Sequence, residues 1–128
     1  MKLTAVKDKM HRAYQLKIKI RALQQRIESR ERSDSEVHTG GRGNPRERLQ
    51  DIKMDYEDER AQIFKELPEI RRRLQIEIDA APFDETTKTA LEIYYVELLN
   101  IRETAKRMHY SKSQVYRLIE DGRKKWPK

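Results

Sequence analysis

The chain has 128 residues, enough for one domain or for a small domain with an extension. It contains no cysteine, which excludes disulfides, cysteine nucleophiles and thiolate metal sites. Charged residues make up 40% of it and hydrophobic residues only 36%, so we expect narrow seams between helices instead of a thick layered core. No apolar run approaches the roughly 20 residues of a membrane span, and Met1 to Met10 carries charges throughout, unlike a signal peptide. We therefore expect a soluble cytoplasmic protein without membrane contact.

The net charge of +7 is gathered at the two ends of the chain. Residues 1–32 carry a net charge of +7 and residues 100–128 carry +6, whereas the two segments between them, 33–80 and 81–99, are each −3. Two basic ends around an acidic middle favour contact with a polyanion at one end or at both. The alternative is that these cations only line the solvated faces of long helices.

The first segment is patterned as a helix, because its apolar residues recur at steps of three and four. This stripe consists of Leu3, Val6, Met10, Ala13, Leu16, Ile20, Leu23 and Ile27. The spacing predicts an amphipathic helix of about 30 residues. Residues 33–44 are polar and rich in glycine, which predicts a connecting loop; a P-loop would need a preceding strand and a following Lys-Ser/Thr.

A second long helix is predicted to begin at Pro45, with Asn44 as its N-cap and Glu47 in its first turn. Its stripe consists of Leu49, Ile52, Tyr56, Ile63, Leu67, Ile70, Leu74 and Ile78. Pro68 should kink or break this helix, which is expected to end near Ala80. The two helices either form an antiparallel hairpin within the chain or pair between two chains as a coiled coil.

The C-terminal third is expected to hold shorter helices. Asp84 can cap a helix running through Leu99, and Asn100 is a helix-stop signal. A short helix follows over residues 102–108, interrupted at 109–110.

Ser111 and Gln114 form an S-x-x-Q capping box at the start of the last helix, which runs to about Lys125.

Residues 101–119 have the spacing of a helix-turn-helix, whose crossing needs a small residue and apolar neighbours. The residues that fill the crossing would be Ala105, Met108, Val115 and Leu118. Gln and Arg side chains can read adenine and guanine edges, and hydroxyl and lysine groups at a helix N-terminus can bind phosphate. The expected DNA contacts are Ser111, Lys112, Ser113, Gln114, Tyr116, Arg117, Arg123 and Lys124.

The stretch from residue 90 to 119 resembles domain four of bacterial sigma factors. The whole layout is similar to the ArpU/RinA-type late-gene activators of phages that infect Gram-positive hosts. The positions that carry the motif are Leu91, Tyr95, Ala105, Ser111, Val115, Tyr116 and Arg117. The resemblance is at the level of motifs over residues 83–125, and over residues 1–81 it covers only layout and length. It implies activation of phage late genes together with host RNA polymerase, in the cytoplasm of the bacterial host.

Two positions depart from that family pattern. His109 stands where the turn usually has glycine, and histidine tolerates the left-handed conformation better than a β-branched residue does. Thr104 stands where isoleucine is usual, so either packing is looser there or the hydroxyl bonds back to a carbonyl.

We therefore expect an all-α protein with a helical hairpin over residues 1–81 and a sigma-like helix-turn-helix domain over residues 82–128. The expected partners are double-stranded DNA, host RNA polymerase and a second copy bound through the N-terminal helices. We expect no enzyme activity, no cofactor and no metal: the three histidines show no metal spacing, and the acidic run at 55–59 is typical of a solvated helix face.

Two rival functions remain open at this stage. One is a helical adaptor that binds proteins, with the C-terminal corner merely structural. The other is a DNA-binding phage packaging subunit of the small-terminase kind, although such subunits generally place their DNA-binding part first in the chain.

Overall fold

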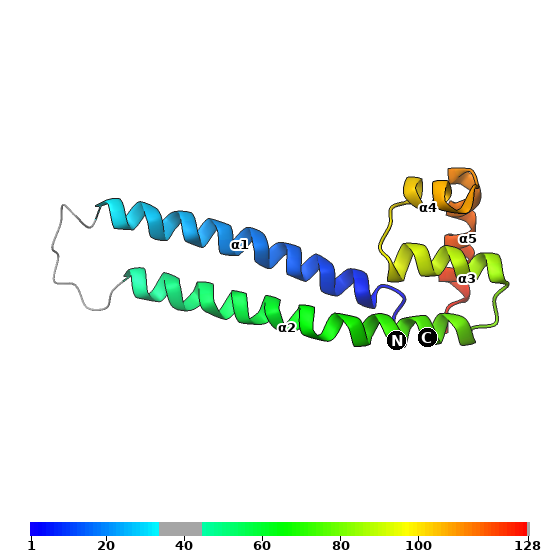
Figure 1. Ribbon diagram of the computed structural model, residues 1–128, viewed down its shortest axis with the longest axis horizontal. Coiled ribbons are helices and arrows are strands. Elements are labelled where there is room, and N and C mark those ends of the chain that lie inside the picture. The colour runs from blue at the N-terminus through cyan, green and yellow to red at the C-terminus, as the bar shows by residue number, and fades with distance from the viewer. Residues whose placement is uncertain (34–44, 128) are drawn as a thin grey trace. The chain divides into compact units, whose positions relative to one another are not determined.

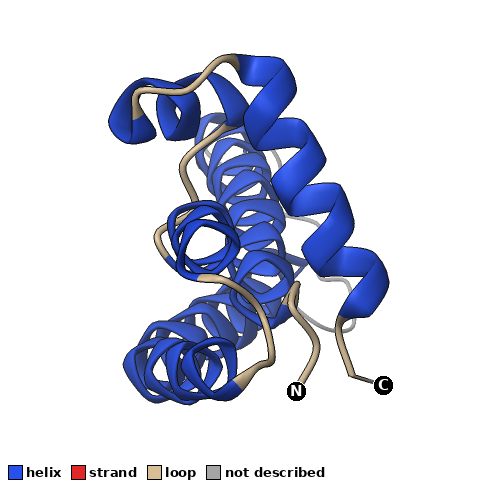
Figure 2. Ribbon diagram, turned by 90° about the vertical axis from the view of Figure 1, so that its right-hand side faces the viewer, coloured by secondary structure: helices blue, strands red, loops and turns tan. Residues whose placement is uncertain are grey.

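The computed structural model describes residues 1–33 and 45–127, so most of the expected loop at 33–44, together with Asn44, lies outside the described residues. The helices are α1 (Ala5–Ser33), α2 (Pro45–Ala80), α3 (Glu85–Leu91), the π-helical turn η1 (Glu92–Val96), α4 (Ile101–Met108) and α5 (Lys112–Lys125), coloured in chain order in Figure 1. Figure 2 shows helices and loops but no strand in the part of the chain that is described. The all-α expectation is confirmed.

Packing divides the chain into two compact units. Unit 1 comprises Met1–Lys9 and Glu66–Lys128, and unit 2 comprises Met10–Lys65. These units do not follow the expected boundary between residues 81 and 82, because the first residues of the chain and the end of α2 pack with the C-terminal helices. A division of roles at residue 81 stays a prediction.

Unit 2 is a pair of antiparallel helix segments from one chain. Leu23 and Ile27 of α1 are buried with Leu49 of α2, and Tyr56 packs against them. Arg12 of α1 holds the carboxylate of Glu59 on α2 through two hydrogen bonds of 2.8 and 3.1 Å. Within the chain, therefore, the apolar stripe of α1 faces the stripe of α2.

Unit 1 contains the N-terminal residues, the end of α2 and the short helices. Leu3 and Val6 are buried in it, as are Leu74 and Ile78 of α2. The predicted stripes are confirmed at most positions, but Ile52 is 36% exposed and contributes little to the seam of unit 2.

Of the predicted kink or break at Pro68, the break is wrong, because α2 runs unbroken from Pro45 to Ala80 with Pro68 inside it. Proline removes one backbone hydrogen bond and crowds the carbonyl four residues earlier, at a cost of about 3 kcal/mol. The buried residues Leu67, Leu74 and Ile78 on either side of it offset that cost.

The helix expected to reach Leu99 ends at Val96. The last turn widens, with the amide of Glu97 donating to the carbonyl of Glu92 at 3.0 Å, and Leu98 then takes a left-handed φ of 61°. Asn100 does more than stop a helix: its side chain accepts the amide of Glu103 at 2.8 Å and caps α4. A leucine at positive φ is strained, so packing must hold this corner in place.

Candidate nucleic-acid interface

A tight left-handed turn joins α4 to α5. His109 has a φ of 59°, as expected for the residue in the usual glycine position. The amide of Tyr110 donates to the carbonyl of Ala105 at 3.0 Å, and the amide of His109 donates to that of Lys106 at 3.4 Å. These two bonds form a Schellman motif, which ends α4 and turns the chain within three residues.

For Thr104 the sequence left two alternatives, namely looser packing or a hydroxyl that bonds back to a carbonyl. Its side chain is fully buried, and its hydroxyl donates to the carbonyl of Asn100 at 2.8 Å. The back-bonding alternative is therefore the one observed, and the buried hydroxyl is satisfied.

The capping box at the start of α5 is confirmed. The amide of Gln114 donates to the hydroxyl oxygen of Ser111 at 3.2 Å, and the amide of Ser111 donates to Oε1 of Gln114 at 2.9 Å. A glutamine that reads adenine uses both its oxygen and its nitrogen. In this conformation the oxygen of Gln114 serves the cap, so base reading by Gln114, which stays a prediction, requires it to leave the capping box.

Helix α5 is held by close packing on one face. Val115, Ile119 and Gly122 are buried on that face. A Cβ atom added at Gly122 would lie 2.8 Å from Cδ1 of Leu91, a fully buried residue of α3. Among the predicted crossing residues, Ala105 and Val115 are buried, whereas Met108 and Leu118 are partly buried.

All eight expected DNA contacts are exposed on α5 and its cap, namely Ser111, Lys112, Ser113, Gln114, Tyr116, Arg117, Arg123 and Lys124. Arg123 binds the carboxylate of Glu120 at 3.0 Å, and this hydrogen bond raises the pKa of Arg123 above its ordinary value. Lys112, Arg117 and Lys124 have no partner among the described residues. Arg117 lies two positions beyond the buried Val115 and so points away from the packed face.

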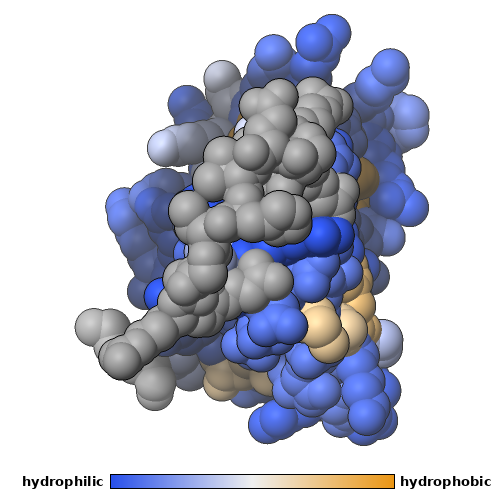
Figure 3. Space-filling model, turned by 90° about the vertical axis from the view of Figure 1, so that its left-hand side faces the viewer, coloured by the Kyte–Doolittle hydropathy of each residue, from blue (hydrophilic) through white to orange (hydrophobic). Residues whose placement is uncertain are grey.

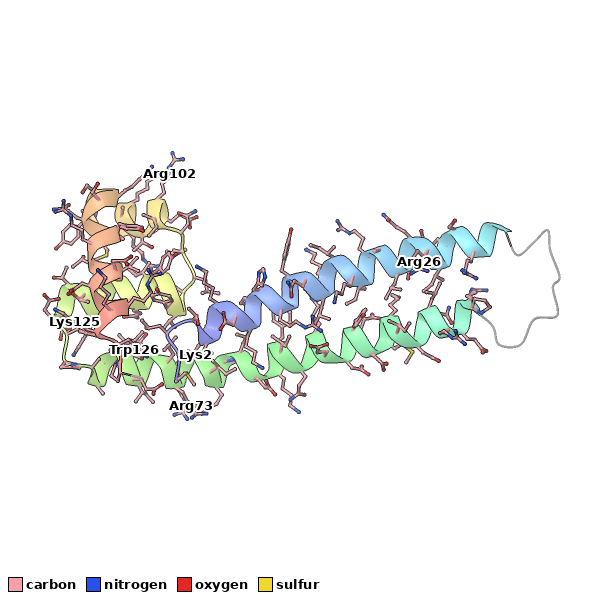
Figure 4. All side chains as sticks on the ribbon, turned by 180° about the vertical axis from the view of Figure 1, so that it is seen from behind. Lys2, Arg26, Arg73, Arg102, Lys125 and Trp126 are labelled. Atoms are coloured by element: carbon pink, nitrogen blue, oxygen red, sulfur yellow. The ribbon has the colours of Figure 1, made fainter. Side chains whose placement is uncertain are left out.

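Two further cations were not singled out by the sequence pattern. Arg102 and Lys106 lie one turn apart on α4, are exposed and have no partner in the described part of the chain. Figure 4 shows Arg102 reaching outward from α4. The charge count of residues 100–128 could have flagged them, but the motif draws attention to α5 alone. We refer to Arg102, Lys106, Lys112, Arg117 and Lys124 as the free cations.

The tyrosines differ in what they offer a nucleic acid. Tyr116 is 59% exposed on α5, whereas Tyr95 is buried and its ring meets that of Tyr94 edge to face, with centroids 4.9 Å apart. Burial raises the pKa of Tyr95. Tyr95 is therefore a core residue, and Tyr116 is the tyrosine of α5 that is open to a ligand.

The acidic run at 55–59 takes part in ion pairs with basic side chains of α1 and α2. Glu59, from the acidic run at 55–59, is occupied by Arg12. The described residues contain no group of three His, Cys, Asp or Glu side chains placed to hold a metal ion, and none of their helices has the length and apolar character needed to cross a membrane. Figure 3 shows a mainly hydrophilic surface with small apolar patches on the side it presents.

No protein-family model, no curated protein and no solved structure matches this chain.

Proposed function

We propose that α4 and α5 form a helix-turn-helix that binds double-stranded DNA in a sequence-specific manner, and that the protein regulates transcription. The observation that carries this proposal is the set of free cations on α4 and α5, two helices joined by a Schellman turn. Five unpaired cations on two short helices supply a surface for phosphates that no carboxylate of the described residues neutralises.

The N-terminal part of α5 is the element that would enter the major groove. Arg117, on the face opposite the packed one, has the length and the fork geometry to bind O6 and N7 of guanine. Lys112, Ser113 and the first amides of α5 would hold a phosphate, and Lys124 would hold another further along the helix. Arg102 and Lys106 of α4 would reach the backbone beside the groove.

The regulatory part of the proposal rests on the resemblance to ArpU/RinA-type activators. The protein would activate phage late genes in the bacterial cytoplasm by helping host RNA polymerase at a promoter. The Schellman turn at His109 and the capping box at Ser111 support the same layout, because both fix the angle at which α5 would be presented.

A homodimer through the N-terminal helices belongs to this proposal. Unit 2 buries six apolar side chains in its seam and leaves nearly as many large ones exposed, namely Tyr14, Ile18, Ile52, Met54 and Phe64. A two-helix pair with so small a core gains stability when a second copy covers such residues. Sedimentation equilibrium of the full chain should show a concentration-dependent dimer, and Tyr14→Asp should shift it toward monomer.

The DNA proposal is tested by selecting bound duplexes from a random library and measuring their affinity by fluorescence anisotropy at two salt concentrations. We expect Arg117→Ala to lower affinity for the selected site by roughly 5- to 150-fold and to relax the preference for one base pair. Lys112→Ala should weaken all duplexes alike and reduce the salt slope by about one.

Arg21→Ala is the matched control, because Arg21 is an exposed cation on α1 in unit 2 and has no partner within residues 1–33 and 45–127. Equal losses for Arg21→Ala and Arg117→Ala would reduce the proposal to unspecific charge attraction. Absent duplex binding would favour the adaptor function, and binding without any selected site would favour packaging.

A further inference from the structure

A groove of about 600 Å³ lies between the first four residues of the chain and the C-terminal end of α5, all within unit 1. Leu3, Trp126 and Pro127 supply apolar lining, and Lys2 and Lys124 stand beside them. Figure 4 shows Lys2 next to Trp126. The lining of the groove thus combines apolar and basic side chains.

Two contacts fix the tryptophan wall. The indole Nε1 donates to the carbonyl of Met1 at 2.9 Å, and the ring stacks on Phe83 with centroids 6.4 Å apart. Since its one polar atom is satisfied, the rest of the partly exposed Trp126 ring offers an apolar surface.

The charges around the groove are unevenly neutralised. Arg123, which also lines the groove, is held by Glu120 at 3.0 Å. Lys2 and Lys124 have no carboxylate partner among the described residues. An occupant that carries negative charge on both sides of an apolar group would satisfy both lysines.

We propose that this groove binds an acidic peptide segment of a partner protein, with one large apolar side chain between carboxylates. The apolar side chain packs on Trp126, and the flanking carboxylates pair with Lys2 and Lys124. Double-stranded DNA fits the groove less well, because its bases are paired and stacked inside the duplex and its outer surface offers phosphates and sugars but no apolar group for Trp126. The site does not depend on DNA binding, although Lys124 is common to both surfaces, so peptide and DNA compete for it.

The experiment uses the full chain to select peptides from a random phage-displayed library. We expect enriched sequences to place Asp or Glu on both sides of Leu, Ile or Phe. The synthetic consensus peptide is then titrated while the emission of Trp126 is followed, which is unambiguous because the chain has a single tryptophan. The emission should change on binding, and the affinity should fall as the salt concentration rises.

The variant Lys2→Glu should weaken peptide binding at least tenfold and duplex affinity much less, because Lys2 is not among the expected DNA contacts. Lys17→Glu, an equal charge change at an exposed residue of α1, is the matched control and should bind the peptide as the parent does. If the parent chain does not bind duplex DNA, the proposed function is overturned but the peptide-binding groove is not.

The peptide proposal is overturned if no acidic–apolar sequence is enriched, if Lys2→Glu binds the peptide as well as the parent, or if Trp126 does not respond. It is also overturned if short duplexes change the Trp126 emission and Lys2→Glu abolishes that change, since the groove then belongs to nucleic acid.

Discussion

The basic side chains of α1 and those of α5 differ in their ion-pair partners, although the two ends of the chain carry similar net charges. In α1, Lys9 lies 3.5 Å from Glu66, and Arg12 lies 2.8 Å from Glu59. Both acidic partners belong to α2, far along the sequence. These ion pairs therefore connect one helix to another and help to fix their register.

In α5, the paired cations are bound to carboxylates of the same helix. Arg123 pairs with Glu120 three residues before it, and Lys125 with Asp121 four residues before it. Such local pairs contribute only a few tenths of a kcal/mol to a helix and do not join it to a neighbour. Packing and caps hold α5, which leaves the free cations available to a ligand; net charge alone could not have revealed that difference.

The largest effect should follow from breaking the packing that holds α5. Gly122→Val adds bulk where a single Cβ would already lie 2.8 Å from the buried Leu91 side chain. We expect the free energy of unfolding, measured in urea, to fall by about 2 to 3 kcal/mol. Gly122→Ala should cost less, because a gain in helix propensity of about 1 kcal/mol offsets part of the clash. A Val variant as stable as the parent would mean that α5 is not held at this contact.

Charge reversals on α1 and α5 can distinguish basic residues that stabilise the fold from those expected to bind DNA. Arg12→Glu places two carboxylates together at Glu59, so the melting temperature should fall while duplex affinity of the folded protein stays unchanged. Arg117→Glu should leave the melting temperature within about one degree and lower duplex affinity at least about tenfold. If Arg12→Glu lost as much affinity as Arg117→Glu, the contrast between the two helices would be wrong.

The long helices and the caps could be predicted from the sequence because each depends on local rules. A stripe at steps of three and four requires one buried face, and Asp84 and Ser111 stand directly before helical segments that need capping. The left-handed turn at His109 was expected from the resemblance, because glycine is usual at that position and favours a positive φ.

The features that could not be predicted from the sequence depend on packing between distant residues. The wide turn ending in Leu98 exists because Ile93, Tyr95 and Val96 are all buried, a demand set by neighbouring helices. The hydrogen bond from Trp126 to Met1 joins residues at opposite ends of the sequence, so no local sequence pattern predicts the groove beside it. The pairing of cations is equally non-local, so the sequence does not show that Arg102 and Lys106 lack partners among the described residues.

A smaller effect should separate capping from base reading at the start of α5. Ser111→Ala should lower the free energy of unfolding by about 1 kcal/mol, and Gln114→Ala by somewhat less, because each removes one half of the capping box. The duplex selected by Gln114→Ala should keep the parent's base preferences, since Oε1 is bound to the amide of Ser111. A changed preference at one base pair would show that Gln114 leaves the cap to read DNA.

The smallest effect concerns Asp84, the cap of α3. The pKa of Asp84 is lowered, first by hydrogen bonds from the side chain and amide of Thr87 and then, more weakly, by the charge of Lys125. A depressed carboxyl pKa stabilises the fold above the unfolded-state pKa, and that stability is lost as the pH falls through the folded value. Asp84→Asn keeps a capping side chain, so it should cost little at neutral pH, and the difference from the parent should vanish in acid.

The variant Lys125→Met tests whether a cation of α5 stabilises a neighbouring helix through Asp84. It should raise the pKa of Asp84 only slightly, as followed by NMR titration, because the Thr87 hydrogen bonds dominate. A large rise would mean that a cation of α5 also holds a neighbouring helix in place. The distinction would then lie between the paired cations, which stabilise the fold at both ends of the chain, and the free cations, which do not.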